Sequence, residues 1–212
     1  PHFRSFHDRK AKVIRCLDSG SPFMHPIQES ELDQLRRQKA RLEEDVVRLV
    51  MIDQLTGLLN RAAFMSRVDA HFKAVGTDAP LAAIIEFGLT GLPRLTGALG
   101  RHVGDYLVSA LSARLHAFAD SSTLCCRLDY RSFAIFIPNI ADPLAAMTQA
   151  KAFLNKLCEP VDWVDRKLTV EIGAGVALSS AGENDATALL HNAGLAYKSA
   201  TDRGGPGYAF FN

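Results

Sequence analysis

The chain has 212 residues, of which 48% are hydrophobic and 22% charged, a balance typical of a folded globular protein and not of a disordered one. Its formal net charge of +1 excludes a strong overall field directed at nucleic acid or at an anionic membrane surface. No apolar run reaches the roughly 18 residues of a membrane span and no secretory signal core opens the chain, so we expect a cytoplasmic segment. The four cysteines lack metal-ligand spacing, so we expect reduced core thiols, no metal and no cofactor.

The first segment, residues 1–28, has a loose helical spacing of apolar residues that breaks at Asp18–Pro22. It is either the tail of an upstream domain or a short docking segment, and the sequence leaves both readings open. Because the chain starts at Pro1 and not at Met, we expect a fragment of a longer protein.

Residues 29–52 carry a heptad pattern. Side chains suited to a helix interface recur at alternating steps of three and four residues, at Leu32, Leu35, Lys39, Leu42, Val46 and Leu49. This stripe, flanked by charged residues, predicts a coiled coil, and we expect a homodimer formed through residues 30–50. The alternative is a single amphipathic helix packed on its own domain, since the same stripe fits a helix with one buried face.

A specific motif follows the heptads. The stretch Asp53–Phe64 has the pattern D-x-L-T-G-L-L-N-R-x-x-F, with Asn60 placed to cap the next helix. It resembles the opening of the GGDEF domain, the diguanylate cyclase family, and later landmarks keep the same register across residues 53–212. The resemblance implies an α/β (α+β) fold similar to the palm-like core of nucleotide cyclases, with a mixed, mostly antiparallel central sheet flanked by helices and preceded by a long helix.

The remaining elements are predicted from apolar runs and helical periodicity. Leu81–Phe87 predicts a central strand. Leu124–Leu128 and Phe133–Ile137 predict the two strands of a hairpin, whose turn we expect at the edge of the buried sheet. We also expect helices over Pro143–Leu157 and through Leu189–Tyr197, a strand or hairpin over Lys167–Leu178, and a last strand at Tyr208–Phe211. The predicted core contains Leu55, Phe64, Ile84, Leu107, Leu111, Phe133, Ile135, Ile172 and Leu195.

The two hairpin strands are joined by a polar turn, Asp129-Tyr130-Arg131-Ser132, which we name the signature turn. In the family that the chain resembles, this turn and the next residue form the catalytic signature Gly-Gly-Asp-Glu-Phe, of which only Phe133 remains. Asp105, which matches a guanine contact of the family, is retained, but Thr96 replaces a second guanine contact.

The metal ligands implied by the resemblance are also missing. Gly88 stands at the place of the first metal-binding Asp, Thr90 replaces the second acid of the pair, and Arg131 and Ser132 replace the signature acids. Joining two GTP molecules into cyclic di-GMP needs divalent ions held by hard oxygen ligands. We therefore predict that the chain is not an enzyme but a pseudo-diguanylate cyclase.

A dimeric protein-interaction or signal-relay module in cyclic di-GMP signalling is the function we expect, with Asp129, Tyr130, Arg131 and Ser132 as the candidate site for a protein partner. The alternative is a non-catalytic sensor that binds GTP or cyclic di-GMP through Arg131 and Asp105. A third possibility is an active cyclase with unusual ligands.

Overall fold

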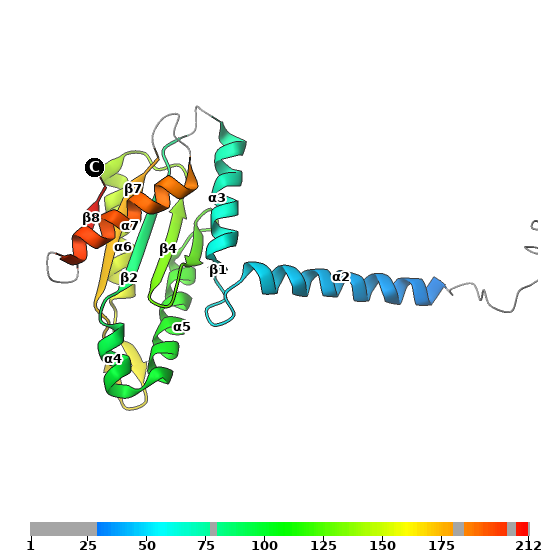
Figure 1. Ribbon diagram of the computed structural model, residues 1–212, viewed down its shortest axis with the longest axis horizontal. Coiled ribbons are helices and arrows are strands. Elements are labelled where there is room, and N and C mark those ends of the chain that lie inside the picture. Colours follow the sequence, from blue (N-terminus) through cyan, green and yellow to red (C-terminus); the bar gives the residue numbers. More distant parts are fainter. Residues whose placement is uncertain (1–28, 77–79, 180–184, 203–206, 212) are drawn as a thin grey trace, which may run out of the picture. The chain divides into compact units, whose positions relative to one another are not determined.

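Figure 1 shows the computed structural model, which describes residues 29–76, 80–179, 185–202 and 207–211, so the expected segment 1–28 lies outside the described residues. The elements in chain order are α2 (Glu29–Met51), β1 (Leu59–Asn60), α3 (Arg61–Val75), β2 (Ala83–Leu89), α4 (Leu92–Leu99), α5 (Arg101–Phe118), β3 (Leu124–Arg127), β4 (Ser132–Ile137), α6 (Pro143–Leu157), β5 (Val161–Trp163), β6 (Arg166–Leu168), β7 (Ile172–Leu178), α7 (Ala186–Asp202) and β8 (Tyr208–Phe210). The chain divides into two compact units between Asp45 and Val46, so the end of α2 from Val46 to Met51 belongs to the following domain. Within the described ranges, no helix is both long and apolar enough to cross a membrane.

The domain is built on a six-stranded sheet in the order β1-β3-β4-β2-β7-β8. β2 pairs antiparallel with β4 and β7, and β3 pairs antiparallel with β4, whereas β1–β3 and β7–β8 are parallel. The prediction of a mixed, mostly antiparallel sheet is therefore confirmed. The hairpin strands β3 and β4 are both inner strands of the sheet, so the signature turn lies at the strand ends, at that edge of the sheet.

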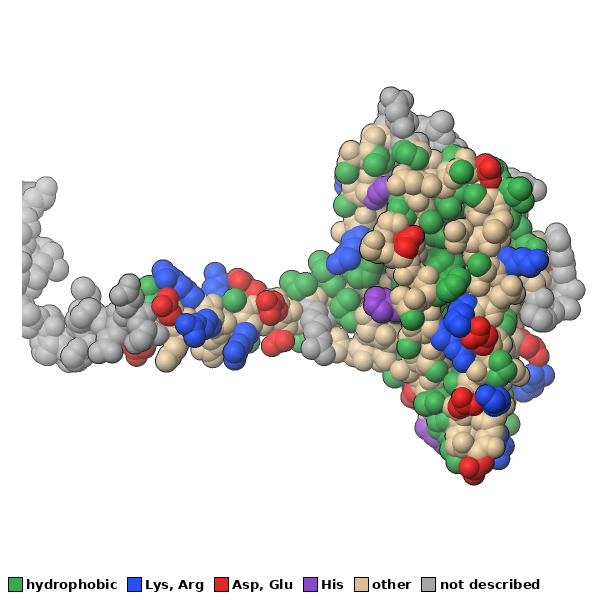
Figure 2. Space-filling view, turned by 180° about the vertical axis from the view of Figure 1, so that it is seen from behind, with side chains coloured by type: hydrophobic (Ala, Val, Ile, Leu, Met, Phe, Trp, Pro, Cys, Tyr) green, Lys and Arg blue, Asp and Glu red, His purple; other side chains and the backbone are tan. Residues whose placement is uncertain are grey.

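Helices cover both faces of the sheet, α3 and α7 on one face and α5 and α6 on the other (Figure 1). Successive side chains of a strand point to opposite faces, so Ile84 and Ile85 of β2 enter different cores. The neighbours Cys125 and Cys126 are divided in the same way, and burial raises the pKa of both thiols to about 12. On the face of the domain shown in Figure 2, acidic and basic side chains are interspersed, which agrees with the small net charge.

Most of the predicted core is confirmed. At most 1% of each residue is exposed for Phe64, Ile84, Leu107, Leu111, Phe133, Ile135 and Ile172. The predictions for Leu55 and Leu195 are wrong, because these residues are 38% and 45% exposed. Leu55 lies in a turn before β1, and Leu195 lies on the outer side of α7, between the buried positions Ala193 and Ala196.

Three boundaries differ from the prediction. β2 extends to Leu89, so Gly88 lies inside the strand and not after it. Ser132 begins β4 and pairs with Gly88, and the residue is only 7% exposed, so it is a strand residue and not a residue of an exposed turn. The run Lys167–Leu178 is shared between β6, which pairs with β5 in a separate hairpin, and β7 of the main sheet.

Candidate functional site

The candidate site lies where β2, β4 and β7 end beside helix α7. Gly88 of β2 has Ser132 of β4 on one side and Gly173 of β7 on the other. The ladder continues into the signature turn, because the backbone N–H of Leu89 donates to the carbonyl of Arg131 at 2.8 Å. Three small residues side by side leave room for a large side chain from α7 above them.

Tyr197 of α7 fills that room. A Cβ atom on Gly88 would lie 2.1 Å from Tyr197 Cζ and 2.2 Å from Oη, and one on Gly173 would lie 3.2 Å from Cε2. An aspartate at position 88 therefore cannot coexist with the ring in its present place. Burial, with the nearby Glu86 carboxylate, raises the pKa of the Tyr197 hydroxyl, so Tyr197 presents a neutral phenol where the resemblance places a metal-binding carboxylate.

The signature turn itself is held by one side-chain and one backbone hydrogen bond. Asp129 Oδ1 accepts a hydrogen bond from the Arg131 backbone N–H at 2.7 Å, and the Leu128 N–H donates to the Ser132 carbonyl at 2.9 Å. The Arg131 side chain is exposed, and every ion pair in the described part of the domain involves other residues. Its guanidinium therefore does not pair with Asp129 or Asp105 and remains accessible to a partner.

Asp105 lies half-buried near the start of α5, next to Gly104. A Cβ atom on Gly104 would lie 2.6 Å from Thr96 Cγ2 and 3.6 Å from the hydroxyl oxygen of Tyr130. The structure thus brings the Tyr130 hydroxyl of the signature turn near Gly104 at the start of α5, where Thr96 of α4 also lies. Thr96 is already engaged, since its hydroxyl donates to the Pro93 carbonyl at 3.1 Å.

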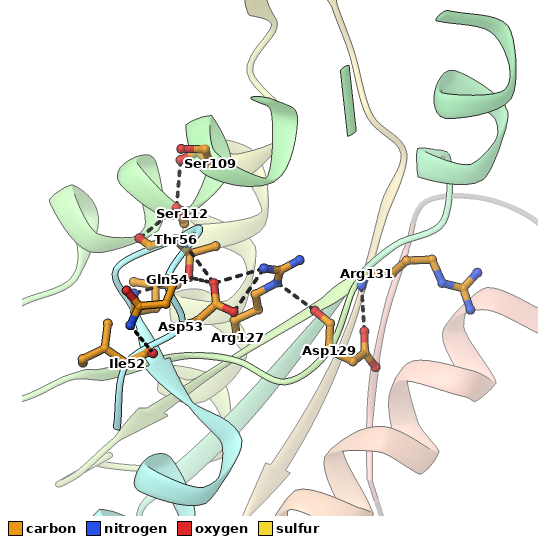
Figure 3. Close-up of polar contacts among 10 residues, drawn as sticks. Ile52, Asp53, Gln54, Thr56, Ser109, Ser112, Arg127, Asp129 and Arg131 are labelled. Carbon is orange, nitrogen blue, oxygen red and sulfur yellow. Dashed lines mark hydrogen bonds and ion pairs between the residues drawn. The ribbon is translucent and has the colours of Figure 1, made fainter. Parts of the chain in front are cut away.

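A charged contact joins the segment after α2 to the signature turn (Figure 3). Arg127 Nη1 lies 3.0 Å from Asp53 Oδ1 and 3.1 Å from Oδ2, and Arg127 Nε donates to the Asp129 carbonyl at 3.1 Å. The side chains of the pair are only 14% and 25% exposed. A half-buried ion pair is screened less by solvent than a surface pair, so this contact fixes the two segments against each other.

Asp53 is also the centre of the preceding turn. Its carboxylate accepts hydrogen bonds from the N–H and the hydroxyl of Thr56 at 2.9 and 2.8 Å. Burial opposes ionisation of Asp53, but the bonds from Thr56 and Arg127 outweigh it and hold the pKa of the carboxyl below its ordinary value. Asn60 caps α3 as predicted, accepting from the Ala63 N–H, and its amide donates to the Val50 carbonyl in the last turn of α2.

Glu86 is a site residue that the sequence did not reveal. It lies two residues before Gly88 on the same face of β2, and it is half-buried. Burial, with the negative charge of Asp129, raises the pKa of the Glu86 carboxyl to about 7, and Arg61 opposes this shift. In the sequence, Glu86 is the one charged residue of an apolar run, a pattern that fits an exposed strand position as well as a half-buried site residue.

We expect Glu86→Gln to change how stability depends on pH. The folded-state pKa is raised, so the folded protein holds more protons than the unfolded chain between about pH 4.5 and 7, and wild-type stability falls as pH rises through this window. At pH 8 the variant should be more stable than wild type by about 1–2 kcal/mol, a value reduced for partial solvent screening, with little difference at pH 4.5. Urea unfolding across this range measures it. Glu43→Gln, at an exposed position of α2, is the control, and parallel curves for wild type and Glu86→Gln would contradict the assignment.

The residues of the site do not fit a divalent metal ion. Across the described ranges, no cluster of three or more His, Cys, Asp or Glu side chains could hold one. Thr90 is engaged elsewhere, because its hydroxyl donates to the Glu171 carbonyl at 3.1 Å. Arg131 places a cation, and Tyr197 a neutral ring, where hard anionic oxygens would be needed.

Comparison with known proteins agrees with the fold. The family described as "Diguanylate cyclase, GGDEF domain" matches residues 50–206. The bifunctional diguanylate cyclase/cyclic di-GMP phosphodiesterase MucR of Pseudomonas aeruginosa is 26% identical over 201 residues, which is 95% of this chain and 28% of that protein. The chain spans between 22% and 28% of the length of the first three curated relatives that it matches.

Two solved structures show the same fold. The GGDEF domain of PA1120 (TpbB or YfiN) from Pseudomonas aeruginosa superposes with a TM-score of 0.71 at 22% identity, covering 76% of this chain and 94% of that one. The coiled coil and GGDEF domain of DgcB from Caulobacter crescentus, in complex with c-di-GMP, superposes with a TM-score of 0.73 at 15% identity, covering 96% of this chain and 99% of that one. At these identities the likeness is one of fold alone.

Proposed function

The chain belongs to the diguanylate cyclase (GGDEF) domain family, and we propose that it is a catalytically inactive member that acts as a dimeric interaction or relay module in cyclic di-GMP signalling. The observation that carries this proposal is the Tyr197 ring, which occupies the space a carboxylate at position 88 would need. Loss of the ligand and filling of its place are separate obstacles to metal binding.

Three requirements of phosphoryl transfer are unmet together. Gly88 offers no ligand, Arg131 brings a positive charge, and Ser132 offers a buried neutral hydroxyl in place of a carboxylate. Electrostatic stabilisation of the transferring phosphoryl group is the main task of such a site, and removal of one stabilising group typically costs about 3–4 kcal/mol. Their joint loss supports an inactive domain.

The polar path through Arg127 supports a relay. It starts at the Val50 carbonyl in the last turn of α2, which accepts from Asn60, and Asn60 lies opposite Arg127 in the β1–β3 ladder. Arg127 in turn binds the Asp53 carboxylate and the Asp129 carbonyl. A shift at the end of α2 would therefore act on the exposed signature turn through hydrogen bonds and a half-buried ion pair. This path needs no bound nucleotide.

The apolar stripe of α2 supports dimerisation. Its residues are exposed in the single chain, with Leu35 at 55%, Leu42 at 57% and Leu49 at 67%. Charged residues pair along the helix: Asp33 pairs with Arg36 beside the stripe, and Lys39, the one charged stripe position, pairs with Glu43. A helix with one bare apolar stripe is stabilised when a second helix covers it.

The alternative, a nucleotide sensor, is disfavoured by two aromatic side chains. Tyr197 fills the place beside Gly88, and Tyr130 reaches the start of α5 near Gly104, the residue before Asp105. Calorimetry with GTP and with cyclic di-GMP separates the two functions, because the proposed module releases no heat of binding with either.

Arg131→Ala tests the proposed interaction surface. We expect recovery of protein partners from a lysate of the source cells to fall by about tenfold, because exposed Arg is a frequent hot spot of interfaces. The melting temperature should stay the same, since the guanidinium makes no ion pair within the described domain. Arg94→Ala, which breaks an exposed pair with Glu171, is the matched control. Equal partner recovery with a lowered melting temperature would show that the signature turn is only structural.

A further inference from the structure

A pocket of about 360 Å³ lies beside the signature turn, on the face of the sheet covered by α3 and α7. Polar side chains from four elements (α3, β2, β4 and α7) and from the signature turn line it, namely Arg61, Glu86, Asp129, Ser132, Thr187 and His191. Its volume is at the low end of the range for small-molecule sites, which suits one side chain or one small ligand.

The Ser132 hydroxyl is the first observation that supports a ligand in this pocket. Ser132 Oγ is buried and has no hydrogen-bond partner among the described residues, and the residue is 7% exposed. Register places Ser132 beside Gly88 and Ala134 beside Glu86, so Ser132 and Glu86 point to the same face of the sheet and both line the pocket. Buried hydroxyls are nearly always hydrogen-bonded, so an unpartnered one in a pocket wall indicates a ligand.

Carboxylates dominate the charge around this hydroxyl. Glu86 lies against α7 where Gly194 leaves room for it, since a Cβ on Gly194 would be 3.1 Å from Glu86 Oε2. Asp129 is the second acid of the lining. The lining also contains His191 and one arginine, Arg61. Arg61 forms no ion pair with either acid in the described structure. One oxygen of Asp129 already accepts from the Arg131 N–H, so the groups left for a ligand are its other oxygen, the Glu86 carboxylate and the Ser132 hydroxyl, which are mainly hydrogen-bond acceptors.

We propose that this pocket binds a single ammonium or guanidinium group, supplied by a small amine or guanidine or by a Lys or Arg side chain of a protein. Such a group carries several N–H donors and a positive charge, and it would satisfy Ser132 Oγ and the carboxylates of Glu86 and Asp129 together. Arg61 opposes binding by charge repulsion.

NMR titration of the 212-residue chain tests the proposal. Agmatine represents a free guanidine, acetyl-arginine-N-methylamide represents a protein side chain, and acetyl-citrulline-N-methylamide is the uncharged control of the same shape. We expect saturable shifts of the pocket resonances with at least one arginine-type probe, and binding at least about tenfold weaker with the citrulline probe. The stronger of the two arginine-type probes identifies the source of the group.

Three variants sharpen the test. Glu86→Gln should weaken binding by about tenfold or more, and Ser132→Ala should weaken it less, whereas Arg61→Gln should strengthen it. Thermal melts confirm that each variant is folded, and Ser132→Ala removes only an unpartnered hydroxyl. Equal binding of the citrulline probe, absence of saturable shifts with all probes, or binding of inorganic phosphate that Arg61→Gln abolishes would each overturn the proposal.

Discussion

A chain in which both Leu35 and Leu42 are replaced by Asp is expected to be a folded monomer. Both residues fall at d positions of the heptad stripe, and both are more than half exposed in the single chain. In a parallel dimer each substitution would bury an unpaired carboxylate against its counterpart on the other helix. We expect the dimer dissociation constant to rise by about 100-fold or more, while the domain that begins at Val46 keeps its melting temperature.

The matched control moves the same changes by one residue. Gln34→Asp with Arg41→Asp places two carboxylates at the same spacing on the solvent side of the helix, at c positions, and should leave the dimer intact. Light scattering over a concentration series measures both proteins. A double Leu35→Asp, Leu42→Asp variant that is still dimeric would show that α2 is not the interface and would favour the single amphipathic helix.

Gly88→Ala is expected to destabilise the domain by about 1–3 kcal/mol, the usual cost of overpacking. Its new methyl group would lie 2.1–2.5 Å from three atoms of the Tyr197 ring, so the ring must leave its place. Tyr197→Ala should remove this clash, and the double variant should be less destabilised than the sum of the two single changes. Urea unfolding of the four proteins gives the coupling energy.

Gly97 provides the control for this cycle. It lies on an exposed face of α4, where a methyl group added to its Cα would meet no neighbouring atom within 4 Å, so Gly97→Ala should stabilise the helix by up to about 1 kcal/mol. Strict additivity of Gly88→Ala and Tyr197→Ala would mean that the ring does not fill the place of the missing ligand. The main physical support for an inactive site would then be lost.

The fold could be predicted from the sequence wherever apolar residues follow one clear period. The predicted helix Pro143–Leu157 matches α6 at both ends. Its start is clear in the sequence because Asp142 caps the helix and Pro143 occupies the first helical position. The helix α2 and the Asn60 cap were equally clear. The prediction that Leu195 is buried is wrong because α7 has apolar residues on most of its sides, so the sequence does not show which of them face the sheet. The prediction that Leu55 is buried is wrong because it rested on a motif, and a motif position does not determine burial.

For the site, the sequence could predict only which side chains of the family's catalytic site are replaced. The replacements at Gly88, Arg131 and Ser132 are visible in the sequence, but what fills the vacated space is not. Tyr197 is far from Gly88 in the chain, and only the pairing of β2 with β7 and the packing of α7 bring its ring over the glycine. Glu86 and the unpartnered Ser132 hydroxyl depend on burial, which no local pattern encodes.

Incubation of the purified protein with GTP and Mg²⁺ or Mn²⁺ tests the central claim most directly. An active diguanylate cyclase, assayed under the same conditions, is the positive control. Because Gly88, Arg131 and Ser132 cannot hold the ions and Tyr197 occupies the place of the first ligand, we predict that no cyclic di-GMP forms at any protein concentration. Cyclic di-GMP formed at a rate proportional to the amount of protein would contradict the account.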